Sequence, residues 1–101
     1  MHEAARQLEA LLGEVRPTRP GVLAVLEGDG QLIITETFTR PFATSHVEEL
    51  AMLVRHDDDT WTLQVRSPDG AWETFFDVAE HQPLGFILSE LRDDPSGFFW
   101  G

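Results

Sequence analysis

A strictly alternating run followed by a proline-containing turn is the feature that most limits how this chain can fold. From Thr60 to Arg66, large apolar residues alternate with polar ones, and this period of two is typical of a strand with one buried face. The next four residues, Ser67 to Gly70, include a proline whose fixed φ excludes the tightest two-residue hairpin turns. We therefore expect a β-hairpin with a four-residue loop closed by Arg66 opposite Ala71.

This loop length determines the expected pairing of the two strands. The expected pairs are Val65 with Trp72, Leu63 with Thr74 and Trp61 with Phe76. Both tryptophans would then lie on one apolar face, and Phe75 would lie on the opposite, polar face. A slip of one residue would place Val65 against Glu73, so we expect the register to be well specified.

Apolar periodicity predicts one helix on each side of the strands. Apolar residues recur at three- and four-residue steps over residues 2–15, and Pro17 and Pro20 cannot continue that helix. A second helix is predicted from Pro83 to Leu91, because proline suits the first helical turn. A helix, four or five antiparallel strands and a second helix indicate a single α+β domain spanning residues 1–101.

Further strands are expected before the hairpin. Strands are expected over residues 22–26 and 32–38, with a turn at 27–31, and residues 40–46 are expected to form a loop. Residues 47–56 fit either a helical face or a strand. The strand that follows favours a strand here too, which makes residues 57–59 the tip of a hairpin.

The C-terminal residues resemble those of a known family. The matching segments are Trp61-Thr62-Leu63 in a strand, Gly70-Ala71-Trp72 at the start of the next, a short helix, and Asp94 to Gly101 at the end of the chain. Together they resemble domain-of-unknown-function family 3024, a family of small bacterial proteins, mainly over residues 50–101. The resemblance implies an uncharacterised single-domain protein without assigned catalytic residues. This chain departs from that pattern in being strongly acidic.

Charge and composition argue against several classes of function. The chain of 101 residues has 18 acidic residues and 7 arginines, a net charge of −11. Twelve of the acids and three of the arginines fall in residues 45–101, a balance of −9. Such a field disfavours direct nucleic-acid binding and suits a basic protein partner, or it keeps the protein soluble. Without cysteine, disulfides and thiolate chemistry are excluded, and without a long apolar run we expect a cytoplasmic protein and no membrane span.

Two groups of residues are candidates for chemistry. His56 followed by Asp57, Asp58 and Asp59, with His46 ten residues earlier, has the donor types of a metal site. The alternative is a solvated hairpin tip, and we predict no metal or cofactor.

Glu36 is the other candidate. It lies among apolar residues of a strand, where a buried carboxylate could act as a general acid or base. A solvent-facing position, or a salt bridge to an arginine such as Arg40, is the alternative.

The aromatic residues near the C-terminus are expected either to be buried or to form a surface for association. Three consecutive aromatic residues, 98–100, are costly to expose to water, so we expect this tail to fold back. Phe75 is then either covered by the tail or part of an exposed patch used for association.

The functional hypothesis is a noncatalytic protein-interaction module that binds a basic partner. Its expected binding residues are Glu48, Glu49, Asp57, Asp58, Asp59, Phe75, Phe99 and Trp100. One alternative is self-association, as a homodimer, through a strand edge or the aromatic tail. Another is an enzyme or small-ligand binder that uses Glu36 or His56 in a pocket between helix and sheet.

Overall fold

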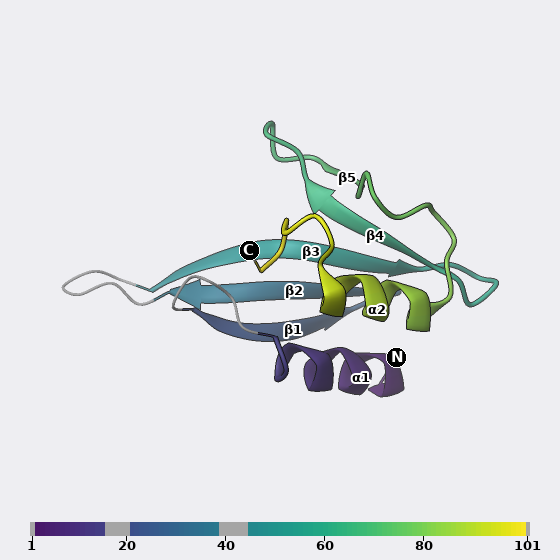
Figure 1. Cartoon of the computed structure of the whole chain (residues 1–101), viewed down its shortest axis with the longest axis horizontal. Coiled ribbons are helices and arrows are strands. Elements are labelled where there is room, and N and C mark those ends of the chain that lie inside the picture. The colour runs from purple at the N-terminus through teal and green to yellow at the C-terminus, as the bar shows by residue number, and fades with distance from the viewer. Residues whose placement is uncertain (1, 16–20, 39–44, 101) are drawn as a thin grey trace.

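The computed structural model describes residues 2–15, 21–38 and 45–100, which form two helices and a five-stranded sheet (Figure 1). This arrangement confirms the predicted α+β fold. The elements are α1 (His2–Leu12), β1 (Val22–Gly28), β2 (Gln31–Phe38), β3 (His46–Arg55), β4 (Trp61–Arg66), β5 (Trp72–Thr74) and α2 (Leu84–Asp93).

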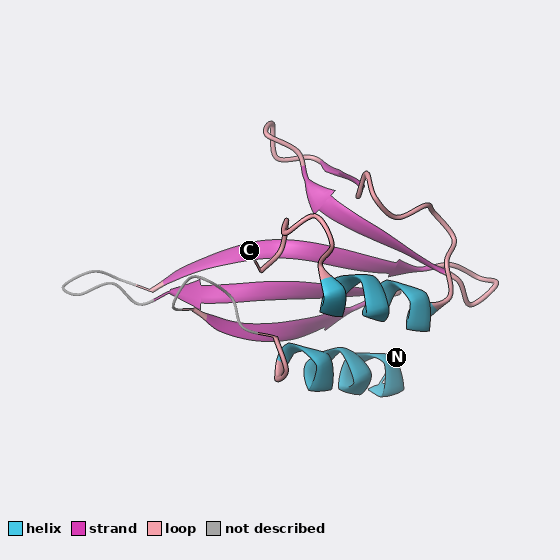
Figure 2. Ribbon diagram, viewed as in Figure 1, coloured by secondary structure: helices cyan, strands magenta, loops and turns pink. Residues whose placement is uncertain are grey.

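The sheet is an antiparallel meander in which every strand pairs with its neighbours in sequence, in the order β1-β2-β3-β4-β5 (Figure 2). Residues 47–56, for which a helix was also considered, belong mostly to β3. The β1–β2 hairpin is tighter than predicted: Gly28 already pairs with Gln31, and Gly30 takes the left-handed φ of 70° that the two-residue turn requires. The predicted loop at 40–46 lies largely outside the described residues.

Both helices differ slightly from the predicted bounds. α1 ends at Leu12, earlier than predicted, because Gly13 weakens the helix before the two prolines are reached. Val15 is nevertheless buried, so the segment after the helix still packs against the core. α2 begins at Leu84, one residue later than predicted, so Pro83 precedes the first turn instead of lying in it. The helix ends at Asp93, and the next residue, Asp94, takes the left-handed conformation while its backbone N–H donates to the Glu90 carbonyl.

The core lies between one face of the sheet and the two helices. Ala5, Leu8 and Leu11 of α1 and Ile87, Leu88 and Leu91 of α2 join one cluster with alternate residues of the strands. The strand residues in this cluster are Leu32, Ile34, Ala51, Leu53, Trp61, Leu63 and Val65. We call this side of the sheet the core face and its reverse the open face.

The predicted register of the last hairpin is wrong by one residue. Arg66 pairs with Trp72 and Val65 pairs with Glu73. The loop has three residues rather than four: Ser67 pairs with Ala71, whose carbonyl accepts the Ser67 N–H at 2.7 Å.

The turn chemistry explains the shift. The Gly70 N–H donates to the Ser67 carbonyl at 2.9 Å, and Gly70 has a φ of 89°. A type I turn followed by a left-handed residue is the usual three-residue hairpin loop. The Asp69 carboxylate holds it by accepting from the Ala71 N–H at 3.1 Å and from the Ser67 hydroxyl.

The shift exchanges the two faces of β5. Phe75, predicted on a polar face, lies on the core face, where its N–H donates to the Leu63 carbonyl at 2.8 Å. Trp72, predicted beside Trp61, lies instead with Arg66, whose guanidinium carbon is 4.4 Å from the indole centroid. A Trp ring under a cation does not need the core, so the hairpin tolerates this exchange.

The C-terminal tail folds back, as predicted. The Asp94 carboxylate accepts the backbone N–H groups of Phe99 at 3.1 Å and Trp100 at 2.8 Å. The Trp100 indole N–H donates to the Leu91 carbonyl at 2.6 Å, and its side chain is buried. The tail therefore completes the core at the C-terminal end of α2.

Candidate functional site

The eight predicted binding residues occupy three separate places. Glu48 and Glu49 lie near the start of β3, whereas Asp57 to Asp59 follow its other end. Eight residue steps, at about 3.3 Å each, separate Glu49 from Asp57 by about 26 Å along the strand. Phe75, Phe99 and Trp100 form part of an aromatic cluster at the C-terminal tail. The structure thus does not unite the eight residues into one site.

Several of the predicted carboxylates are already paired. Glu49 forms an ion pair with Arg66, and Asp59 forms one with Arg55. Glu48 lies 3.4 Å from the His46 ring. All the arginines in the part of the chain that the structure describes are ion-paired in this way; the remaining pairs are Arg6–Glu3 and Arg92–Glu14. The acidic excess therefore lies in the other carboxylates.

The Asp57–Asp59 tip is held by local hydrogen bonds. The Asp58 carboxylate accepts from the Thr60 hydroxyl at 2.6 Å and from the Thr60 N–H at 3.1 Å. The Thr60 hydroxyl bond, followed by the backbone bond, lowers the pKa of Asp58 below its usual 3.8. These bonds make Asp58 part of a turn, and Asp57 remains exposed beside it.

The structure also brings together two histidines that are 25 residues apart. The His56 and His81 rings stack with their centroids 3.9 Å apart. His56 Nε2 lies 2.6 Å from the Thr62 hydroxyl, which also accepts the His81 N–H at 3.2 Å. Because the Thr60 hydroxyl gives its proton to Asp58, His81 Nδ1, 3.2 Å away, is the donor to Thr60.

This histidine pair anchors the connection between β5 and α2. His81 has a φ of 58°, which is unusual for a residue other than glycine. The neighbouring Gln82 exchanges two backbone hydrogen bonds of 2.8 Å with Trp61. Sequence reasoning missed the pair because no local pattern links the two histidines.

The side chains considered as a candidate metal cluster do not come together. His46 begins β3 and His56 follows its last residue, so the two histidines lie at opposite ends of the strand. Among the described residues, no group of three or more histidine or carboxylate side chains is arranged to hold a metal ion. The histidine next to the three aspartates stacks on His81 instead.

Glu36 is buried on the core face, with 1% of its surface exposed. It pairs in register with Leu23 and Glu48, and the chain passes directly over it at Gly21. A Cβ atom at position 21 would lie 2.7 Å from the Glu36 carboxyl carbon, so only glycine allows this approach. The suggested partner Arg40 lies outside the described residues.

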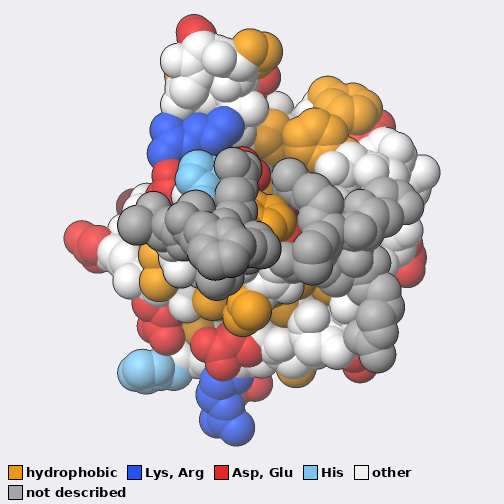
Figure 3. Space-filling view, turned by 90° about the vertical axis from the view of Figure 1, so that its left-hand side faces the viewer, with side chains coloured by type: hydrophobic (Ala, Val, Ile, Leu, Met, Phe, Trp, Pro, Cys, Tyr) orange, Lys and Arg blue, Asp and Glu red, His pale blue; other side chains and the backbone are white. Residues whose placement is uncertain are grey.

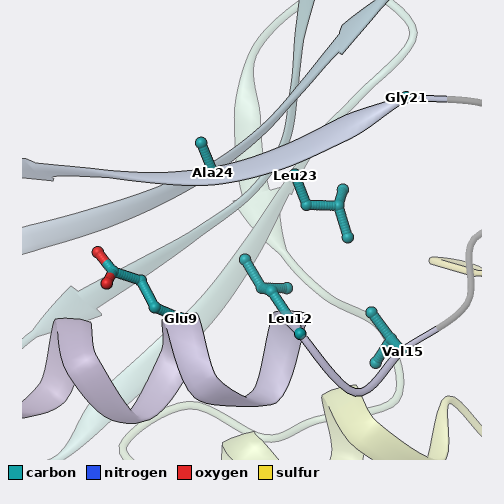
Figure 4. Close-up of a pocket in the computed structure, with 7 residues that line it drawn as sticks. Glu9, Leu12, Val15, Gly21, Leu23 and Ala24 are labelled. Atoms are coloured by element: carbon teal, nitrogen blue, oxygen red, sulfur yellow. The ribbon is translucent and has the colours of Figure 1, made fainter.

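A cavity of about 380 Å³ lies between α1 and β1 (Figure 4). In Figure 4, Leu23 points toward Leu12 and Val15, whereas Ala24 points to the other side of β1. The Glu9 carboxylate lies at the other end of this lining. The cavity's lining residues are mostly apolar, and Glu9 brings a carboxylate to one end.

The aromatic cluster contains the most exposed large apolar side chains of the C-terminal half. Phe75 lies at its centre, buried, with ring centroids at 4.7 Å from Phe76, 5.2 Å from Phe98 and 5.0 Å from Phe99. Phe76 is 74% exposed and Phe98 is 52% exposed. We call these two rings the phenylalanine patch. The tail thus covers Phe75 but leaves its two neighbours in solvent.

The side of the molecule seen in Figure 3 is mixed rather than uniformly acidic. Figure 3, viewed from one end of the sheet, shows acidic side chains spread around the periphery, few basic ones, and hydrophobic groups between them. No helix in the described ranges is long and apolar enough to cross a membrane.

These features define an α+β protein with a helix-covered antiparallel meander, a tail closed by Trp100 and an exposed phenylalanine patch. The chain belongs to the family described as Domain of unknown function (DUF3024), which it matches over residues 1–101. The match extends the resemblance from the C-terminal half to the whole chain. No curated protein and no solved structure matches the chain.

Proposed function

We propose that this chain is a noncatalytic protein-interaction module that binds a basic partner through the phenylalanine patch. The observation that carries the proposal is the exposure of Phe76 and Phe98, 74% and 52%, on top of the buried Phe75. Aromatic residues are enriched at protein interfaces, and exposed clusters of them are costly without a partner. Phe76, in the loop after β5, and Phe98, in the tail, both contact the buried Phe75 ring.

The charges near the patch favour a basic partner over an acidic one. Asp77 directly follows Phe76 and is exposed, as is Glu73 on β5. Asp93, at the end of α2 before the tail, is exposed as well. Carboxylates around an apolar centre accelerate encounter with a positively charged surface, and phenylalanine faces accept arginine or lysine side chains.

Affinity capture with matched variants tests this proposal. The full chain is immobilised, a cell extract is applied at 50 mM and 500 mM NaCl, and retained proteins are identified by mass spectrometry. We expect a basic protein to be retained at low salt and lost at high salt. Phe76→Ser should abolish retention, whereas Phe86→Ser, which alters a 44% exposed phenylalanine near the start of α2, should not.

The proposal is wrong if nothing basic is retained, or if Phe76→Ser retains the same protein as the unaltered chain. It is also wrong if binding at 500 mM NaCl equals that at 50 mM, because exposed charges are largely screened at the higher salt.

A further inference from the structure

The open face of the sheet carries no helix in the described part of the chain. Both helices and the tail join the cluster on the core face. Because residues paired across antiparallel strands lie on the same face, the strand register identifies every strand residue of the open face. One row crosses all five strands: Leu26, Ile33, Met52, Gln64 and Thr74. The adjoining rows are Val22, Thr37 and Val47; Ala24, Thr35 and Glu49; Gly28, Gln31, Val54 and Thr62; and Arg66 with Trp72.

The strand residues of this face carry no net charge in a protein of net charge −11. Glu49 is the one acidic residue among them, and Arg66, the one arginine among them, forms an ion pair with it. At the β5 edge, the Glu80 carboxylate accepts a hydrogen bond from the Thr74 hydroxyl at 2.9 Å. Threonine, glutamine and apolar side chains make up the rest of these strand residues, so most of the acidic excess lies on other surfaces.

The open face also exposes apolar side chains. Val22 and Leu26 of β1 are 70% and 53% exposed, and Val47 of β3 is 56% exposed. A groove of about 500 Å³ lies between Leu26 and Val47, and Glu48, Glu49 and Arg66 also line it. Thr35, Met52 and Thr62 of this face are buried, so its exposed apolar side chains lie on β1 and at the start of β3. Exposed branched aliphatic residues on one side of a sheet are typical of a surface that packs against another sheet.

We propose that a second copy of this chain packs against the open face, so that two sheets meet in a symmetric homodimer. Two copies of an acidic protein repel each other over most of their surfaces. The strand residues of the open face, whose one glutamate is paired with Arg66, bring few like charges together when two copies meet there. A two-fold axis also places the open face of one copy against the open face of the other. Glu49 of each copy can then pair with Arg66 of the other copy.

The size of the face is sufficient for this interface. Five strands spaced by about 4.8 Å and about seven residues long cover about 450 Å² in projection. Protruding side chains enlarge the accessible area, so the pair would bury about 1,000 Å² in total. That value reaches the lower limit for specific interfaces and predicts a dimer that dissociates at micromolar concentrations.

Sedimentation equilibrium of the full chain at 5–200 µM in 500 mM NaCl tests the dimer. We expect the unaltered chain to approach twice its 11.4 kDa mass. Leu26→Glu places a charge in the central row and should weaken dimerisation more than tenfold. Val47→Glu serves as a second variant in case the first does not fold, and circular dichroism verifies both.

Phe76→Glu is the matched control, because it adds the same charge at an exposed site outside the open face. The dimer should persist in this variant. A monomer at 200 µM overturns the proposal, as does a dimer that survives both Leu26→Glu and Val47→Glu, or one that only Phe76→Glu disrupts. The result is independent of the proposed function, since Leu26→Glu should still capture the basic partner and Phe76→Ser should still dimerise.

Discussion

At the scale of single residues, Trp100 fixes the tail to α2 by a bond that a smaller aromatic residue cannot make. Its indole N–H donates to the Leu91 carbonyl, one of the helix-end acceptors that lack an intrahelical partner. Trp100→Phe should therefore lower the free energy of unfolding by about 1–3 kcal/mol, because it leaves a buried carbonyl without its donor. Urea denaturation followed by circular dichroism measures this.

The half-buried Trp72 provides the comparison for Trp100. Its ring contacts the Arg66 guanidinium on the open face, so Trp72→Phe should cost less than about 1 kcal/mol. Equal losses in the two variants would show that the indole N–H bond does not hold the tail.

The Asp69 carboxylate gives a prediction about pH. The hydrogen bond from the Ser67 hydroxyl, followed by that from the Ala71 N–H, lowers the pKa of Asp69 below 3.8. The stabilisation from this carboxylate is therefore complete above pH 3.8 and is lost as the pH falls through the lower, folded-state pKa. NMR titration of the carboxyl carbons should show Asp69 with a midpoint below 3.8, identified by the signal that Asp69→Asn removes. A midpoint at or above that value contradicts the turn geometry.

Residue-scale chemistry was the least predictable part of the candidate site. Sequence reasoning singled out Phe75 and left open whether the tail covers it, because its exposure depends on the hairpin register. The stack of His56 on His81 could not be foreseen, since it depends on how the β5–α2 connection returns to Trp61. Burial of Glu36 likewise required knowing which of two faces of β2 the helices cover.

At the scale of elements, the register of β4 and β5 leads to a stabilising substitution. Glu73 pairs with Val65 on the core-facing side of a short edge strand. Glutamate is a poor strand residue beside an aliphatic neighbour, so Glu73→Thr should raise the free energy of unfolding by about 0.2–1 kcal/mol. Thermal and urea denaturation measure the gain.

The register predicted from the sequence leads to a different expected result for the same substitution. With Val65 opposite Trp72, Glu73 would lie on the other face of the strand and away from Val65, and Glu73→Thr would bring little change. Contacts between Gln64 and Thr74 in NMR spectra would independently support the observed pairing.

Periodicity predicted the elements well, while loop length misplaced their pairing. The alternation around Leu63 and the helical steps near Leu88 reflect burial, which acts on the whole element and survives an error of one or two residues. The choice between a three- and a four-residue loop depends on whether one hydrogen bond joins Ser67 and Ala71. Such a difference moves every side chain of β5 to the opposite face.

At the scale of the whole molecule, the two proposed binding surfaces, the phenylalanine patch and the open face, differ in charge. The phenylalanine patch has exposed carboxylates such as Asp77 near it, whereas the open face contains one internal ion pair. Salt weakens attraction between opposite charges and also weakens repulsion between two chains of net charge −11. The two proposed associations should therefore respond to salt in opposite directions.

Raising NaCl from 50 to 500 mM should strengthen dimerisation severalfold and weaken capture of the basic partner more than tenfold. Dimerisation gains because the neutral open faces meet while the acidic surfaces behind them repel less. Partner binding loses because the carboxylates beside Phe76 are screened. Sedimentation of the unaltered chain measures the first effect, and partner capture by the Leu26→Glu variant, which should be monomeric, measures the second. If salt shifted both in the same direction, net charge would not govern how this protein associates, and the neutrality of the open face would lose its significance.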